Sequence, residues 1–425
     1  MRIVKARFVN PDHNLWYGLF AVAISIFVFA YSIRFGKVSI LAYYGLWLPL
    51  ILVDYRKALG NPGDLGWIVP FAAFACLSVF WSAAPGISAR ASVQFASHVV
   101  CALIAARTVS VRTLTLGSLL GTLLVLFFSV AFGQYHFDPL DGSYSFVGAF
   151  PSKNQLGLFA SLGVYFAFAA LVVLGERGLW RIVALACGAL SAVMLLKSQS
   201  ATSIIALAAV LAIMTCLKLG VMFSPSVRRG ALLTGTMLAV GAVLVGLNLG
   251  GLDLLLAAFG KDATLTGRTY LWSQGWAAAA NAPFFGVGYQ AYWVQGFSEA
   301  ERLWEEFYIG SRSGFHFHNT FIEVAVELGL VGVALLVVVM LRTFAGHMRR
   351  VVSDAHNEDS LVLFGVVAML VVRAFVEVDV INPYVVGSFL LFYSAGRLAA
   401  ARGARRPLFQ TAARRRQRAL PGSAP

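Results

Sequence analysis

Long apolar segments separated by short polar ones run along almost the whole chain. A membrane-spanning helix needs about 20 mostly apolar residues, with about 17–25 tolerated. On that criterion the sequence predicts about twelve spans and an all-α polytopic membrane fold. The predicted spans lie near residues 15–33, 38–53, 67–82, 91–107, 114–133, 155–174, 182–196, 203–217, 231–250, 320–341, 360–377 and 384–398.

One long polar excursion, residues 251–319, interrupts this pattern. It divides the chain into four parts. Transmembrane helices 1–9 are expected within residues 1–250, and helices 10–12 within residues 320–398. A basic tail follows over residues 399–425. The excursion is the largest segment outside the hydrocarbon, so we expect the chemistry there.

A first amphipathic helix is expected inside the excursion. Thr266 is a good N-cap for a helix from about Gly267 to Ala280, and Asn281-Ala282-Pro283 would end it. Trp272 and Trp276 are four residues apart and share a face. We expect this face to lie on the membrane surface or to cover the helix bundle.

A second amphipathic helix is expected from Ser298 to Tyr308. Ser298 is followed three residues later by Glu301, which is the pattern of a capping box. In that motif the serine and the glutamate each satisfy one free backbone N–H at the start of the helix.

The distribution of basic residues predicts the orientation in the membrane. With the amino terminus in the cytoplasm, 23 of the 33 Lys and Arg residues fall in cytoplasmic segments, as the positive-inside rule requires. Both termini are then cytoplasmic and the excursion faces outward. The seven arginines between Arg402 and Arg418 contribute to this signal and can contact anionic lipids.

Composition removes several other classes. The chain is 59% hydrophobic and 12% charged, whereas soluble domains are about a quarter charged. The net charge of +14 does not indicate nucleic acid, because aromatic platforms and a folded polar domain for it are missing. The four cysteines lie in apolar runs, so neither disulfides nor a zinc site is expected. Residues 1–7 are expected to be an uncleaved start rather than a signal peptide.

Basic residues at predicted helix starts are candidates for anion binding. Arg268 opens a helix, where a guanidinium beside free backbone amides suits a diphosphate; an ion pair with Asp262 is the structural alternative. Lys153 and Asn154 stand where a loop enters a span, and Arg90 begins another span. A lysine there opposes the helix dipole unless an anion neutralises it. Snorkelling to the interface is the alternative for both cations.

Polar residues continue into the tenth span. His318 and Asn319 immediately precede it, and Asn319, Glu323 and Glu327 recur every four residues along one helical stripe. Ionisable groups at membrane depth are functional candidates. We expect Glu327 to form a structural salt bridge with Arg373. Glu323 lies nearer the surface and is the better candidate for an acid or base.

Two histidines, His316 and His318, alternate as in an extended segment, so both can point one way. Two histidines without a third ligand are weak evidence for a metal, and neither a metal nor a cofactor is expected. A histidine that titrates near neutrality is better suited to act as a base or hydrogen-bond donor for a hydroxyl.

The order of these motifs resembles the O-antigen ligase and O-antigen polymerase superfamily. The sequence of residues 261–269 is most similar to that of bacterial exopolysaccharide polymerases of the succinoglycan type. The resemblance covers about Trp81 to Gly332. Its motifs are Gly148…Lys153-Asn154, Thr266-Gly267-Arg268-Thr269…Trp272, Pro283…Gly286…Gly288 and His318-Asn319…Glu327-Leu328-Gly329-Leu330-Val331-Gly332.

The resemblance implies a GT-C-like, metal-independent glycosyltransferase at the periplasmic face of the bacterial inner membrane. Its donor would be a glycan on undecaprenyl diphosphate. In this family, arginines near the long loop are thought to hold the diphosphate and the histidine of the His-Asn pair lies at the reaction centre. These roles fall on Arg268 and His318. The substrate-binding candidates are Arg268, Arg90, Lys153, Asn154, Asn319 and Trp272.

In the expected mechanism Arg268, with Arg90 and Lys153, neutralises the diphosphate leaving group. His318 or Glu323 deprotonates the acceptor hydroxyl, which attacks with inversion. The expected partners are the lipid-linked glycan, the bilayer, a polysaccharide flippase and a chain-length regulator. Two alternatives to a polymerase remain. One is a ligase that transfers the glycan to lipid A core. The other is a transporter, either of lipid-linked sugar or coupled to protons.

Overall fold

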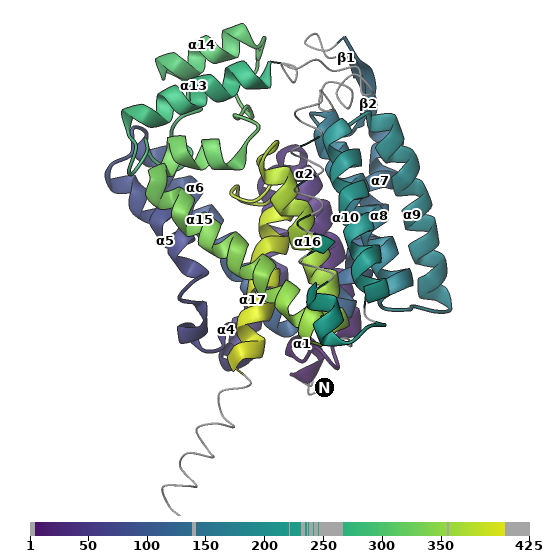
Figure 1. The fold of residues 1–425 in the computed structure, drawn as a ribbon. Coiled ribbons are helices and arrows are strands. Elements are labelled where there is room, and N and C mark those ends of the chain that lie inside the picture. Colours follow the sequence, from purple (N-terminus) through teal and green to yellow (C-terminus); the bar gives the residue numbers. More distant parts are fainter. Residues whose placement is uncertain are drawn as a thin grey trace, which may run out of the picture.

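A computed structural model of the chain is mostly helical (Figure 1). It describes residues 5–137, 142–220, 222–230, 267–354 and 357–403, with positions 234, 235, 237, 241 and 245 between them. The helices that precede the hairpin are α1 (Ala6–Val9), α2 (Leu15–Trp47), α3 (Pro49–Val53), α4 (Tyr55–Leu59), η1 (Pro62–Leu65), α5 (Val69–Leu77), η2 (Ser78–Phe80), α6 (Pro85–Thr108) and α7 (Val111–Phe132).

A two-stranded antiparallel hairpin, β1 (Gln134–Phe137) and β2 (Tyr144–Gly148), follows α7. The remaining described helices are α8 (Lys153–Phe168), η3 (Ala169–Val173), α9 (Leu179–Ser198), α10 (Ala201–Gly220), α13 (Arg268–Asn281), α14 (Ser298–Glu306), α15 (Thr320–Ser353), α16 (Glu358–Ala374) and α17 (Val386–Gly403).

Seven helical segments of the described chain are long and apolar enough to cross a membrane. They confirm the class of polytopic membrane protein but not the expected number of spans. A pair of segments bent by 83°, residues 55–65 with 69–80, would make an eighth. The seven are Leu15–Val53, Pro85–Thr108, Val111–Phe132, Lys153–Val173, Leu179–Ser198, Ala201–Gly220 and Thr320–Ser353.

The expected spans differ from these segments for identifiable reasons. Spans 15–33 and 38–53 form one long helical segment, which bends inside α2 at Tyr31 and at Gly36, where φ is +56°. The short expected span 67–82 is one arm of the bent pair. Span 231–250 lies almost wholly outside the described residues. Polar residues near a bend lower the mean hydropathy, so the sequence predicts a loop there although the helix continues.

Small residues allow helices α2 and α7 to pack closely against each other. A Cβ on Gly117 would lie 2.7 Å from Val22, and one on Gly121 would lie 2.7 Å from Ile26. Two glycines four residues apart therefore form a groove that admits the partner helix, as in many membrane helix pairs.

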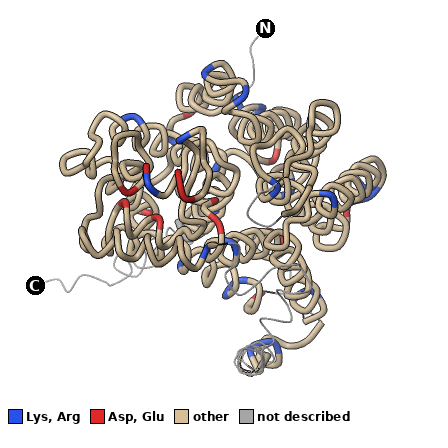
Figure 2. Tube along the Cα trace, turned by 90° about the horizontal axis from the view of Figure 1, so that it is seen from above, with Lys and Arg blue, Asp and Glu red and all other residues tan. Residues whose placement is uncertain are grey.

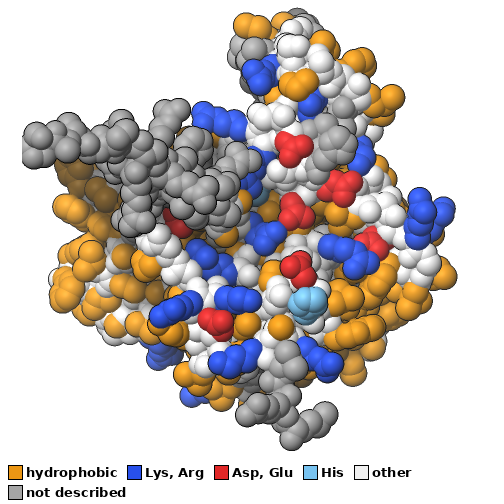
Figure 3. Space-filling view, turned by 90° about the horizontal axis from the view of Figure 1, so that it is seen from below, with side chains coloured by type: hydrophobic (Ala, Val, Ile, Leu, Met, Phe, Trp, Pro, Cys, Tyr) orange, Lys and Arg blue, Asp and Glu red, His pale blue; other side chains and the backbone are white. Residues whose placement is uncertain are grey.

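The bundle has two different ends. Helices α13 and α14 and the hairpin lie at one end, and the amino terminus and the end of α17 lie at the other (Figure 1). Seen from the α13–α14 end, most of the tube is tan, and the acidic positions gather mainly in one half of the view (Figure 2). On the opposite face, basic side chains are scattered among acidic ones, with hydrophobic side chains at the margins (Figure 3).

The two amphipathic helices of the excursion form, but their caps differ from the predicted ones. Gly267, with φ at +81°, precedes α13, and no side chain caps that helix; Thr266 lies outside the described residues. At the start of α14 the Glu301 carboxylate accepts the N–H of Gly296, and Ser298 hydrogen-bonds Glu299. The predicted capping box at Ser298 is therefore wrong.

Candidate functional site

Glu377 is the centre of a polar group that joins four parts of the chain. It lies after α16 and is 4% exposed. Arg268 Nη2 donates to its Oε1 at 2.9 Å, and Asn154 Nδ2 donates to the same oxygen at 2.8 Å. His318 Nδ1 lies 3.4 Å from Oε2, and the Thr320 hydroxyl donates to the Glu377 carbonyl at 2.7 Å. Three candidates from the sequence, Arg268, Asn154 and His318, are thus brought together.

The charges around Glu377 keep its carboxyl ionised. Burial alone would raise the pKa of Glu377, but His318, Arg268 and Arg373 outweigh that effect and hold the pKa well below its usual range. The carboxylate therefore remains a hydrogen-bond acceptor throughout the neutral range.

Arg268 lies in the first turn of α13 and is positioned by two acceptors. Besides Glu377, its Nη1 donates to the Val376 carbonyl at 2.7 Å. The alternative partner Asp262 lies outside the described residues. A guanidinium has five N–H donors, and these contacts use two of them.

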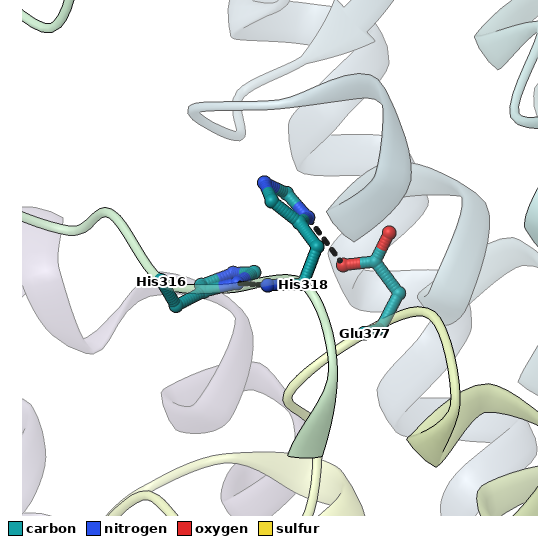
Figure 4. A group of neighbouring side chains, drawn as sticks. All are labelled: His316, His318 and Glu377. Carbon is teal, nitrogen blue, oxygen red and sulfur yellow. Dashed lines mark hydrogen bonds and ion pairs between the residues drawn. The ribbon is translucent and has the colours of Figure 1, made fainter. Parts of the chain in front are cut away.

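His318 has a backbone conformation that few residues adopt, with φ at +51°. Its N–H donates to His316 Nδ1 at 3.0 Å, which fixes the two rings relative to each other (Figure 4). Because a carboxylate faces Nδ1 of His318, the proton is assigned to that nitrogen and Nε2 keeps a lone pair. A histidine held this way can accept a proton at Nε2.

His316 is held as a neutral ring by its surroundings. Its Nδ1 accepts a hydrogen bond and so carries no proton. Burial, together with the neighbouring His318, lowers the pKa of His316 to about 3. His316 therefore acts as an acceptor that shapes the loop, a role with no obvious signal in the sequence.

Phe317, between the two histidines, is held on both sides of its backbone. Its N–H donates to Glu323 Oε2 at 2.8 Å, and its carbonyl accepts Trp272 Nε1 at 2.9 Å. The other oxygen of Glu323 accepts Trp293 Nε1 at 2.9 Å. Glu323 is 3% exposed, and both oxygens of its carboxylate accept hydrogen bonds.

The two tryptophans of α13 differ in their surroundings. Trp272 donates to the Phe317 carbonyl, whereas the side chain of Trp276 is 55% exposed.

The expected salt bridge between Glu327 and Arg373 is wrong. Arg373 Nε donates to Asp379 Oδ2 at 2.6 Å, and its Nη1 donates to Ser203 at 2.8 Å. Both Arg373 and Glu327 are almost fully buried, but the arginine is satisfied by acceptors on the loop after α16 and on α10. Glu327 is buried, as the sequence predicted, but helical spacing did not predict the direction of the arginine.

A break in α15 explains the glycines near Glu327. Gly329 has φ at +63°, which interrupts the helix. The segment 283–288 packs against the break, where Gly288 N–H donates to the Glu327 carbonyl at 2.9 Å and Leu330 N–H to the Pro283 carbonyl at 2.8 Å. A Cβ on Gly329 would overlap the Phe284 backbone. Backbone groups freed by the break are thus satisfied within the protein.

The other candidates lie around this group. Lys153 begins α8, and its Nζ donates to Ser143 at 2.7 Å. Asn319 caps α15 and donates to the Phe375 carbonyl at 2.9 Å. Arg90 is exposed on α6 and makes no hydrogen bond or ion pair with the described residues, so the structure does not join it to Glu377.

Three potential metal ligands, His316, His318 and Glu377, have ligand atoms within 4.8 Å of one another in the described chain. Of these three, only the two histidines were candidates in the sequence analysis. Glu377 already carries Arg268 as its counter-ion at 2.9 Å, and His316 Nδ1 is occupied. A divalent cation prefers a site with excess negative charge. Since the charge of this set is already balanced, it offers a divalent cation no excess negative charge.

Glu377 was the residue that sequence reasoning missed. The side-chain partners of its carboxylate are 59 to 223 residues away in the chain, so no local pattern marks it. An acidic residue at the end of the predicted span 360–377, one helical turn after Arg373, was the available signal.

Comparison with known proteins identifies the family. A family model described as O-antigen ligase matches residues 164–337. "Exopolysaccharide production protein ExoQ" of Rhizobium meliloti (strain 1021) is 59% identical over 402 residues, which cover 95% of this chain and 92% of that protein. The chain belongs to the O-antigen ligase family. Membership confirms the resemblance and supports glycosyl transfer as the general activity. The region matched by the family model contains Arg268 and His318 but not Glu377.

Proposed function

We propose that this protein polymerises oligosaccharide repeat units carried on undecaprenyl diphosphate into exopolysaccharide at the periplasmic face of the bacterial inner membrane. The reaction is an inverting glycosyl transfer without a metal. Family membership supports the reaction class, and the name of the relative from Rhizobium meliloti favours exopolysaccharide as the product. The convergence of Arg268, His318 and Asn154 on Glu377 is the observation that carries the proposal.

His318 acts as the general base. Glu377 holds the proton on Nδ1, so that Nε2 removes the proton of the acceptor hydroxyl as its oxygen attacks the anomeric carbon. The distance of 3.4 Å between His318 and Glu377 is expected to shorten once substrate is bound, because catalytic hydrogen bonds are often long in empty sites. Glu323 is a positioning residue in this mechanism, since one of its oxygens accepts the Phe317 N–H beside His318 and the other accepts Trp293.

Arg268 stabilises the diphosphate leaving group. As the glycosidic bond breaks, the electron pair passes to a phosphate oxygen, and the adjacent guanidinium compensates the charge. Lys153 can assist, because it directly precedes Asn154, which is bonded to Glu377. In this proposal Arg90 is a more distant contact of the diphosphate. Asn319 and Trp272 fix the loop near the glycan.

Membranes from a deletion strain carrying single variants test this proposal. Arg268→Ala should lower polymer synthesis by about 10²–10³-fold, as for loss of a transition-state donor, and Arg268→Lys should restore only part of it. Arg302→Ala is the matched control, because Arg302 is an exposed arginine of α14 paired with Glu306. Full polymer synthesis by Arg268→Ala would show that the assignment is wrong.

A ligase that transfers the glycan to lipid A core is the second candidate, favoured by the description of the matching family model. The two functions differ in their acceptor. Deleting the gene separates them: a polymerase deletion accumulates lipid-linked single repeats, whereas a ligase deletion accumulates lipid-linked polymer.

A further inference from the structure

The hairpin carries four aromatic side chains on one face. Its register pairs Tyr135 with Phe146 and Phe137 with Tyr144, and cross-strand partners point to the same side of a sheet. The rings of Tyr135 and Tyr144 stack with centroids 5.2 Å apart and planes at 15°. Phe146 lies 5.2 Å from Tyr135. The face is therefore a continuous aromatic surface.

This aromatic face is open while the other face of β2 is covered. Tyr135, Phe137 and Tyr144 are 50%, 56% and 63% exposed. On the other face, Ser145 and Val147 are buried where β2 packs against α7, α8 and α9. The hairpin is thus fixed to the bundle by its back and by Phe146, which packs against the core, and it presents the rings of Tyr135, Phe137 and Tyr144 outward.

The hairpin stands in water or in the headgroup layer rather than in hydrocarbon. All four residues of β1 are exposed, including His136 on the back face. The sheet has two strands, so the outer edge of β1 is paired with no further strand of the described chain. An open sheet edge is not tolerated in the hydrocarbon of a membrane, where its backbone groups find no partner.

The aromatic face is linked to the candidate site. Ser143, directly before β2, accepts a hydrogen bond from Lys153, and the next residue, Asn154, donates to Glu377. The hairpin and α13 also lie at the same end of the bundle (Figure 1). A glycan that reaches His318 can therefore extend toward the hairpin.

We propose that Tyr135, Phe137 and Tyr144 form a subsite for pyranose rings of the glycan, outside the reacting position. The inference rests on the proposed function. A pyranose ring presents a face of C–H groups with partial positive charge, which matches the negative face of an aromatic ring. The tyrosine hydroxyls at the edge can bond to sugar hydroxyls. The subsite holds the glycan and leaves the transfer chemistry to the group around Glu377.

A binding experiment tests the subsite. The probe is a set of oligosaccharides made by partial acid hydrolysis of the polymer that wild-type cells secrete, titrated calorimetrically onto the full chain in nanodiscs. The double variant Tyr135→Ala/Tyr144→Ala should bind about tenfold or more weakly, as expected for two lost stacking contacts. Tyr135→Phe/Tyr144→Phe should lose much less. His136→Ala, on the opposite face of the same strand, is the matched control and should bind like wild type.

Two results overturn the subsite: equal affinity of the alanine variant and wild type, or no binding by a wild type that makes polymer. If the alanine variant binds normally but is less stable in lipid than in detergent, the face is a membrane contact and the inference is wrong. Polymer assays separate this failure from failure of the proposed function. If the alanine variant makes polymer of normal length with a normal KM for the lipid-linked substrate, only the subsite is rejected. If wild-type protein leaves lipid-linked repeats unextended, the proposed function is rejected.

Discussion

Asn154 and Glu377 are 223 residues apart in the chain, yet the amide nitrogen of Asn154 lies 2.8 Å from a carboxylate oxygen of Glu377. The Asn154 oxygen accepts the Ser200 hydroxyl at 2.9 Å. This contact ties the start of α8 to the loop after α16, and Arg268 reaches the same carboxylate from α13. The candidate site is thus assembled by one buried carboxylate.

Glu377→Gln should lower transfer by about 10²–10⁴-fold, since His318 would lose the acceptor that fixes its tautomer. Folding should be affected less, because the glutamine oxygen can still accept Arg268. Rates measured with lipid-linked substrate, together with thermal unfolding in detergent, check both parts. Asp359→Asn, which removes the exposed carboxylate partner of Arg397, is the control. A Glu377→Gln protein with wild-type rates would show that His318 needs no such partner.

Glu323→Gln should lower transfer by about tenfold or less, whereas Glu323→Ala should cost more in both rate and stability, because two buried donors lose their acceptors. A positioning role predicts that the midpoint of the pH–rate profile stays the same in Glu323→Gln. If Glu323 were the base, the limb of that profile assigned to the base would disappear. The pH–rate profiles of wild type and variant therefore distinguish the two roles.

Acid should destabilise the protein through His316. Its pKa is about 6.5 when unfolded and about 3 when folded, so the unfolded state binds the additional proton. The stabilisation is complete above pH 6.5 and is lost as the pH falls toward 3. Unfolding temperatures between pH 7.5 and 4 should fall less steeply for His316→Asn than for wild type, with exposed His13→Asn as the control. Parallel curves for all three proteins would contradict this.

Chelation should leave transfer unchanged. The carboxylate nearest to His316 and His318 is already paired with Arg268, so no divalent ion is needed to balance charge. Activity of purified protein after EDTA treatment checks this. Loss of activity that added Mg²⁺, Mn²⁺ or Zn²⁺ restores would assign the three ligand atoms to a metal instead.

Gly329→Ala should destabilise the protein by about 3 kcal/mol or more, because a Cβ at φ +63° meets the Phe284 backbone. Thermal unfolding in detergent measures the effect. Gly220→Ala is the control, since a Cβ there has open space in the described chain. Equal stability of the two variants would mean that the break in α15 is not required.

The sequence was sufficient for the membrane class and the family, and three of its candidates, His318, Arg268 and Asn154, lie together around Glu377. Hydropathy and helix starts are local properties, and the start of α13 needed only the residues around Arg268. The bend at Gly36 and the break at Gly329 were not predictable, because each depends on a glycine with positive φ inside a helical segment that continues beyond it.

The pairing of charges was also beyond the sequence. Arg373 was assigned to Glu327 by depth, but in the structure it turns toward Asp379. Side-chain direction is decided by the packing of α16 against α10, and spacing along one helix contains no information about it. Glu377 was missed for the same reason.

A double-mutant cycle between His318 and Glu377 tests whether Glu377 acts through His318 as the general base. The cycle is measured as the rate of transfer from a lipid-linked donor. If Glu377 acts through His318, the protein with both His318→Ala and Glu377→Gln should be no slower than His318→Ala alone. Losses that multiply in the double variant would show that the two residues act independently, and the proposed base would be wrong.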